Sequence, residues 1–129
     1  MKHNETKLQK QIVQWLKLKG FVYTSTGAGL IKNRTTQMIM MASGYTAGSA
    51  DLIVFIPNGC LHLELKRPAT YRYSAKLKRM VIDDQGGKQS ESQKIFQERI
   101  GKIPGHYYLV ASSLDDVMNF VEKNKIMPK

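Results

Sequence analysis

The chain has 129 residues, with 20 Lys or Arg against 10 Asp or Glu, so its formal net charge is +10. This length predicts one domain, residues 1–129, with a hydrophobic core large enough to fold without a disulfide or a structural metal. Its lone cysteine, Cys60, excludes an internal disulfide and favours a reducing compartment. No apolar run suits a signal peptide or a membrane span, so we expect a cytoplasmic protein without a membrane partner. The surplus of positive charge indicates a polyanionic partner, nucleic acid before membrane, although a merely soluble basic protein has the same composition.

The N-terminal segment predicts a helix from about Asn4 to Lys19, ended by Gly20. Apolar residues recur through it at helical spacing: Leu8, Ile12, Trp15 and Leu16. Glu5 lies on this apolar stripe. Two interpretations of Glu5 stay open: an acid of the first turn that complements the helix dipole, or a third acid carried inward to a carboxylate site.

Residues Phe21–Thr24 predict a short strand, and the glycine-containing segment 25–29 predicts a loop. The loop matches neither a Walker motif nor a dinucleotide fingerprint. Residues Leu30–Ser43 predict a second helix, whose methionines we expect in the core. Lys32 and Arg34 stand near its start and are candidates for contact with phosphate.

The dipeptide Asn58-Gly59 lies between two apolar runs and predicts a hairpin, because both residues tolerate positive φ. With this turn, Asp51 pairs with Lys66. Two residues further along the hairpin, Ile53 pairs with Glu64. One face is then wholly apolar and consists of Leu52, Val54, Ile56, Leu61, Leu63 and Leu65. The other face carries Asp51, Glu64 and Lys66 at the open end of the hairpin, where both carboxylates can reach one metal ion.

His62 lies on the same face as Glu64, two residues deeper in the hairpin. It is either a satisfied interior histidine or a ligand, and the first interpretation is favoured.

Segment 69–87 shows no clear periodicity and forms a basic insertion. No acid occurs from Lys66 to Arg79, where the basic residues are interleaved with Tyr71 and Tyr73; these basic residues are Lys66, Arg67, Arg72, Lys76, Lys78 and Arg79. Loops of this length are usually functional or disordered. The composition suits clamping of a nucleic-acid backbone and stacking on exposed bases. The alternative is a mobile, solvated loop that only raises the net charge.

Ser90 and Gln93 open the next helix as a capping box, and Gln93 shares a face with the apolar residues of that helix. Residues Tyr107–Ala111 predict a buried strand, and Ser113 caps a last amphipathic helix. The elements follow the order helix, strand, helix, hairpin, helix, strand, helix (αβαββαβα). This order predicts an α/β fold in which helices flank a mixed β-sheet.

The run Gly48-Ser49-Ala50-Asp51, an apolar strand, a turn and Glu64-Leu65-Lys66 together resemble the PD-(D/E)xK nuclease signature. With Glu5 on the first helix and Ser90-x-x-Gln93 downstream, the chain resembles a stand-alone VRR-NUC domain over nearly its whole length. Ala50 stands where the family usually has proline, which removes a rigid φ but no ligand. The basic insertion is longer than the usual turn, which bears on substrate preference rather than on chemistry.

The resemblance implies a restriction-endonuclease-like fold and metal-dependent hydrolysis of phosphodiester bonds in DNA. It implies that Asp51 and Glu64 bind Mg²⁺ or Mn²⁺, with the Leu65 carbonyl and Glu5 as further ligands. Lys66 would position or activate the attacking water, or stabilise the transition state. Gln93 would orient the water or the Lys66 ammonium, although a capping role alone explains this residue. No small-molecule cofactor is implied.

Stand-alone members of this family resemble junction resolvases, so the resemblance also implies a branched or structured DNA substrate, a homodimer and a bacterial or phage-infected host cell. The region Leu30–Met41 is the candidate dimer interface. The DNA-binding candidates are Lys32, Arg34, Arg67, Arg72, Lys76, Lys78 and Arg79. Two other functions stay open: a non-catalytic basic DNA-binding subunit with the same fold, and a small sequence-specific restriction-type endonuclease.

Overall fold

The computed structural model describes residues 2–28, 31 and 33–128, with the backbone alone for residues 2–5. In chain order the elements are α1 (Lys2–Lys19), β1 (Val22–Ser25), α2 (Arg34–Ala42), β2 (Leu52–Ile56), β3 (Gly59–Leu65), β4 (Thr70–Ser74), β5 (Arg79–Asp84), α3 (Glu91–Gly101), β6 (His106–Ala111) and α4 (Leu114–Lys123). The predicted α/β class is confirmed. The pair β4–β5 stands where the sequence predicted a loop.

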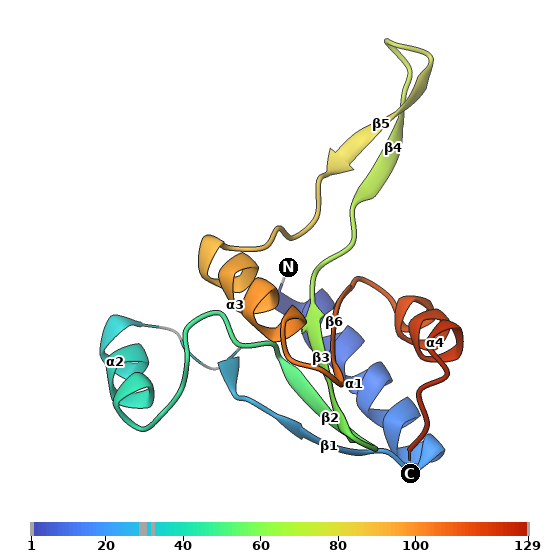
Figure 1. Cartoon of the computed structure of the whole chain (residues 1–129). Coiled ribbons are helices and arrows are strands. Elements are labelled where there is room, and N and C mark those ends of the chain that lie inside the picture. Colours follow the sequence, from blue (N-terminus) through green and yellow to red (C-terminus); the bar gives the residue numbers. More distant parts are fainter. Residues whose placement is uncertain (1, 29–30, 32, 129) are drawn as a thin grey trace.

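A four-stranded sheet of order β1-β2-β3-β6 forms the centre of the fold. Strand β3 pairs antiparallel with β2 and parallel with β6, so the sheet is mixed, as predicted. Helices α1 and α4 cover one face of the sheet and α3 covers the other (Figure 1). Within the described residues, no helix has the length and apolar character that crossing a bilayer requires.

The apolar face of the β2–β3 hairpin packs against α1 and α4. Leu8, Ile12 and Leu16 of α1 recur every four residues and are buried there. They meet the inward side chains of the hairpin, which are buried as the sequence predicted: Leu52, Val54, Leu61, Leu63 and Leu65. Burial of each large aliphatic side chain stabilises the fold by about 1.5–3 kcal/mol. Packing of this apolar face therefore holds β2 and β3 in place, and the opposite face of the same two strands carries the polar residues.

The hairpin turn lies one residue earlier than predicted. Ile56 pairs with Gly59, so the turn residues are Pro57 and Asn58, and Ile53 pairs with His62 rather than with Glu64. Proline fixes a negative φ and Asn58 has a φ of +65°, a combination typical of a type II turn. Gly59 is needed for another reason: a Cβ at this position would lie 1.7 Å from the Gly105 carbonyl oxygen. The apolar and polar faces are nevertheless assigned as predicted.

Helix α2 begins at Arg34, later than the predicted Leu30, because the Asn33 side chain accepts the Thr36 N–H at 2.8 Å and caps the helix there. None of the described side chains of α2 is buried. The prediction that its methionines fill the core is wrong, since exposure reaches 48–63% at Met38, Ile39 and Met41. In Figure 1, α2 stands apart from the sheet.

Strands β4 and β5 form a separate two-stranded sheet that projects from the body of the molecule (Figure 1). We call residues Thr70–Asp84 the arm. Its base is closed by Arg67, whose guanidinium donates two hydrogen bonds of 2.8 Å to the Asp84 carboxylate. Arg67, together with the Gly86 N–H, lowers the pKa of Asp84 to about 2, so the pair is ionised at neutral pH. The arm is thus an ordered hairpin, and the prediction of a segment without periodicity is wrong.

Candidate active site

Asp51 is held at the open end of the β2–β3 hairpin. Its Oδ2 accepts the Leu65 N–H at 2.7 Å, and its backbone carbonyl accepts the Thr26 N–H at 3.1 Å. One further step along the β2–β3 register places Asp51 beside Glu64. The two acids are therefore neighbours on adjacent strands, closer than the diagonal pair that the sequence predicted.

Glu64 is a fully buried acid beneath α3. Its Oε1 accepts hydrogen bonds from the Tyr108 hydroxyl and, at 3.0 Å, from Gln89 Nε2. Burial and the adjacent Glu64 raise the pKa of Tyr108, so its hydroxyl keeps its proton and donates. Among the described residues, Oε2 has no hydrogen-bond partner, and Lys66 Nζ lies 3.8 Å from it. An unpartnered buried oxygen of this kind is costly for a fold.

Lys66 follows the end of β3 and is oriented by α3. Its ammonium donates to Gln93 Oε1 at 2.9 Å, and the same oxygen accepts the Ser90 N–H at 2.8 Å. The capping box is therefore present as predicted. Gln93 can both cap the helix and orient Lys66, because the same side-chain oxygen accepts a hydrogen bond from the Ser90 N–H and from the lysine. The part that Gln93 plays in catalysis stays a prediction.

A cavity of about 310 Å³ opens over these residues. Asp51, Lys66 and Gln93 line it, whereas Glu64 is fully buried and does not line it. Gly48 brings the loop before β2 against the start of α3: its φ is +89°, and a Cβ there would lie 2.2 Å from the Ser92 carbonyl oxygen. Tyr45 also lines the cavity, and burial together with the charge of Asp51 raises its pKa.

Asp51, Glu64 and the Leu65 carbonyl offer the hard oxygen ligands that Mg²⁺ and Mn²⁺ prefer. The unpartnered Glu64 Oε2 fits a ligand of a divalent cation, because it lacks the hydrogen bonds that Oε1 receives. Among the described side chains, no three His, Cys, Asp or Glu residues gather into a metal site. The predicted third acid, Glu5, has its backbone in α1, but its side chain lies outside the described residues.

The predicted DNA-binding residues fall in three places. Lys32 lies outside the described residues, and Arg34 is exposed at the start of α2. The other five belong to the arm and its base: Arg67, Arg72, Lys76, Lys78 and Arg79. Arg67 is bonded to Asp84, and the Arg72 Nε lies 3.2 Å from Asp83. DNA binding by all seven residues stays a prediction.

His62 lies in the interior, as favoured from the sequence, but it is not fully satisfied, because its Nδ1 has no hydrogen-bond partner among the described residues. It is 5% exposed, its Nε2 lies 3.1 Å from His106 Nδ1, and its ring stacks on Tyr108. Burial, with a smaller contribution from the charge of His106, lowers the pKa of His62 to about 4. The ring is therefore neutral at physiological pH and packs between the sheet and α3.

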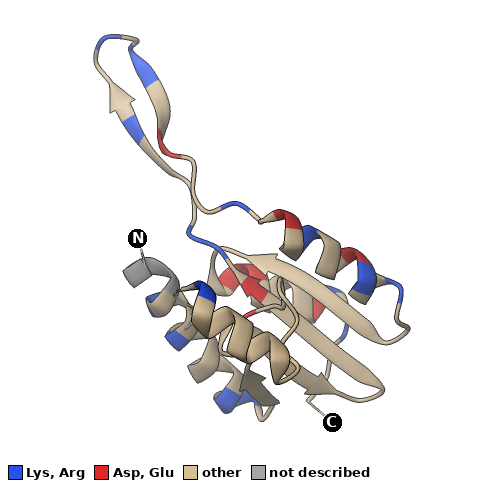
Figure 2. Ribbon diagram, turned by 90° about the vertical axis from the view of Figure 1, so that its left-hand side faces the viewer, with Lys and Arg blue, Asp and Glu red and all other residues tan. Residues whose placement is uncertain are grey.

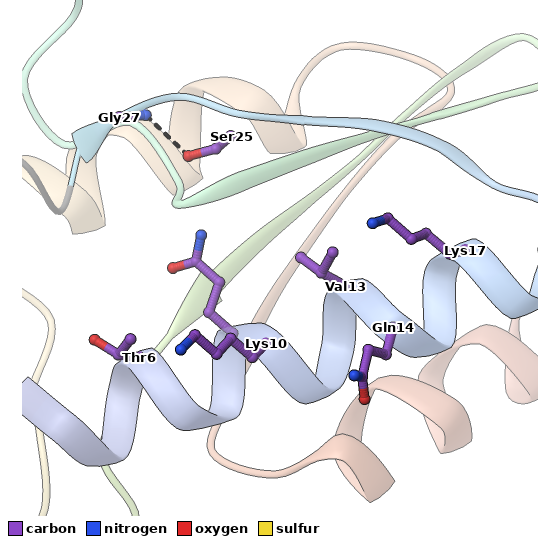
Figure 3. Close-up of a pocket in the computed structure, with 8 residues that line it drawn as sticks. Thr6, Lys10, Val13, Gln14, Lys17, Ser25 and Gly27 are labelled. Atoms are coloured by element: carbon purple, nitrogen blue, oxygen red, sulfur yellow. Dashed lines mark hydrogen bonds between the residues drawn. The ribbon is translucent and has the colours of Figure 1, made fainter.

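A larger cavity of about 620 Å³ lies between α1 and the end of β1, and neither Asp51 nor Glu64 lines it (Figure 3). Lys10 and Lys17 of α1 line it together with Ser25 and Gly27. Its lining contains no carboxylate among the described residues. It therefore lacks the groups on which the chemistry of the smaller cavity depends.

Sequence reasoning missed two residues that contact Glu64. Tyr108 is 44 positions from Glu64 and Gln89 is 25 positions away, so no local spacing connects them. The one signal in the sequence was a pair of polar-tipped tyrosines inside a predicted buried strand, since a buried hydroxyl needs a partner.

Comparison with known proteins bears on the fold. A solved VRR_NUC domain protein superposes with a TM-score of 0.61 over 93% of this chain and 86% of that chain, at 20% sequence identity. The two chains share one fold. The VRR-NUC resemblance is thereby confirmed at the level of the fold. No family model and no curated protein matches the sequence.

The hydrogen bond from Tyr108 to Glu64 generates a stability prediction. Tyr108→Phe removes a donor from a buried carboxylate and should lower the free energy of unfolding by about 1–3 kcal/mol. Tyr107→Phe is the matched control, because Tyr107 is the adjacent residue of β6 and packs its ring against Phe120. Urea denaturation of both variants measures the difference, and equal losses would contradict the role of Tyr108.

Proposed function

We propose that this protein is a metal-dependent nuclease that hydrolyses phosphodiester bonds in DNA. The observation that carries the proposal is the buried Glu64, which has an unpartnered oxygen 3.8 Å from the Lys66 ammonium and lies beside Asp51. The fold shared with a VRR_NUC domain protein supports it. The net charge of +10 suits a polyanionic substrate.

The residues divide the chemistry among them. Asp51, Glu64 and the Leu65 carbonyl would hold Mg²⁺ or Mn²⁺, with Glu5 as a further ligand. A divalent cation there would polarise the phosphodiester and lower the pKa of a bound water. Lys66 would place its positive charge against the charge that develops on the phosphate oxygens. Gln93 holds the Lys66 ammonium at 2.9 Å and so limits the positions that it samples.

Lys66→Ala should lower the cleavage rate at least about 100-fold, because it removes the cation that would face the reacting phosphate. The assay uses end-labelled four-way junction, flap, duplex and single-stranded DNA with Mg²⁺, Mn²⁺ or EDTA. Asp51→Asn should cause a comparable loss.

Lys123→Ala is the matched control, because Lys123 is an exposed lysine on α4, across the sheet from the cavity. Binding without cutting in every metal would replace the proposal with the non-catalytic DNA-binding subunit. The ranking of the substrates tests the further proposal, from the resemblance, that structured or branched DNA is preferred.

Metal binding has a test that does not depend on activity. Mn²⁺ should raise the Tm of the wild-type protein, by a free energy that grows with the ratio of Mn²⁺ concentration to Kd. Glu64→Gln should remove this rise, because it replaces a charged oxygen ligand by an amide, and the Tm measured in EDTA reports separately the loss of the ion pair with Lys66. Differential scanning calorimetry of both proteins decides between the outcomes, and an equal Mn²⁺ effect on both would exclude Glu64 as a ligand.

A homodimer through α2 is the proposed assembly. The exposed side chains of Met38 and Ile39 lie on a helix without a buried residue among those described, which is unusual for a helix of an isolated monomer. Ile39→Glu should convert the dimer to monomer in sedimentation velocity. Ile95→Glu, on the exposed surface of α3, is the control. A wild-type monomer at all concentrations would overturn the dimer.

A further inference from the structure

The arm has one apolar face that is open to solvent. Tyr71 pairs with Ile82, and Tyr73 pairs with Met80, so the four side chains share one face of the two-stranded sheet. Each of them is 55–62% exposed. A lone two-stranded hairpin is only marginally stable in water, and large exposed apolar patches mark sites of interaction.

The outer part of the arm is positively charged. Between Thr70 and Ile82 it carries four cations and no acid; the cations are Arg72, Lys76, Lys78 and Arg79. Figure 2 shows these positive residues along the arm, with negative charge only toward its base. The arm therefore combines exposed aromatic rings with four cations, of which Arg72 is paired with Asp83 at 3.2 Å.

We propose that the arm is a base-stacking wedge, with which the protein selects DNA that carries unpaired bases near the cleavage point. Tyr71 and Tyr73 stack on bases that have lost their neighbours, while Lys76 and Lys78, in the turn at the tip of the arm, contact the flanking phosphates. Every base offers a π face, so this contact tolerates any sequence. In intact duplex those faces are covered by stacking, and only the phosphate contacts remain. The existence of a cleavage point rests on the proposed nuclease function, whereas the binding of unpaired bases by the arm does not depend on it.

DNA fits this face better than a second copy of the chain does. Each arm carries four cations against two acids, Asp83 and Asp84, so two packed arms would bring one net positive charge against another, which is unfavourable at an interface. A polyanion instead neutralises them and releases its counterions. Two of the four apolar side chains are tyrosines, whose rings give base stacking that aliphatic side chains do not.

The short segment of chain between Lys66 and the two tyrosines limits how far the stacked bases lie from the site. Tyr71 follows Lys66 by five residues and Tyr73 by seven, so an extended chain separates them from Lys66 by at most about 17–24 Å. With a rise of about 3.4 Å per nucleotide, the stacked bases lie within about five to seven nucleotides of the cleaved phosphate. The Arg67–Asp84 pair at the base of the arm limits its swing.

The test measures binding in EDTA, where no cleavage occurs. Fluorescence anisotropy would compare a duplex with otherwise identical duplexes that carry unpaired bases at increasing distances, up to about seven nucleotides, from a nick. The Tyr71→Ala and Tyr73→Ala double variant should bind the unpaired DNA at least about tenfold more weakly, with little change for intact duplex. The Tyr71→Phe and Tyr73→Phe double variant keeps both rings and should bind like wild type. Leu18→Ala, at an exposed apolar position of α1, is the control.

Three outcomes overturn the wedge: an equal loss for both DNAs, no loss for either, or a double-alanine variant that changes the sedimentation coefficient of the free protein. The last outcome would assign the face to a second copy. Failure of the wedge is distinguishable from failure of the proposed function. Tyrosine-dependent binding without cutting in any metal leaves the wedge standing, and cutting without tyrosine dependence leaves the nuclease standing.

Discussion

The arrangement of the site depends on one buried carboxylate. Glu64 is fully enclosed, and its Oε1 is held by Tyr108 from β6 and Gln89 from the segment before α3. Removing a charge from water is costly unless partners compensate, so these elements must keep their positions for the acid to stay where it is. The same acid has an oxygen left over, 3.8 Å from Lys66. A group that costs stability and is still incompletely satisfied is most simply explained by its chemistry.

Helix α3 contributes to the site through its first turn and through Gln97, which accepts a hydrogen bond from Gln89 at 2.8 Å. Ser90 caps the helix, and Gln93 returns its side-chain oxygen both to the cap and to Lys66. Gly48 allows the loop before β2 to contact this turn, because any side chain there would meet the Ser92 backbone. The position of the lysine is thus set by the same contacts that begin the helix, and the two features cannot vary independently.

Sequence reasoning succeeded where the signal was local. The capping box, the helix periods and the division of the β2–β3 hairpin into apolar and polar faces follow from spacing within a few residues. It failed where the cause was distant. The turn moved because Gly59 is needed for contact with Gly105, and the partners of Glu64 come from segments 25 and 44 positions away. The alternation of Tyr71, Tyr73, Met80 and Ile82 was overlooked because it faces solvent rather than a core.

Thr70 and Asp84 are paired in the ladder, so the chain enters and leaves the arm at nearly the same point. The hydrophobic core of the protein packs the main sheet against its covering helices, and no residue of the arm, which the structure describes in full, belongs to it. An insertion whose two ends meet can be lengthened, shortened or exchanged without redirecting the strands on either side. The arm is therefore an interchangeable part, because that one segment can change while the carboxylate cluster stays as it is.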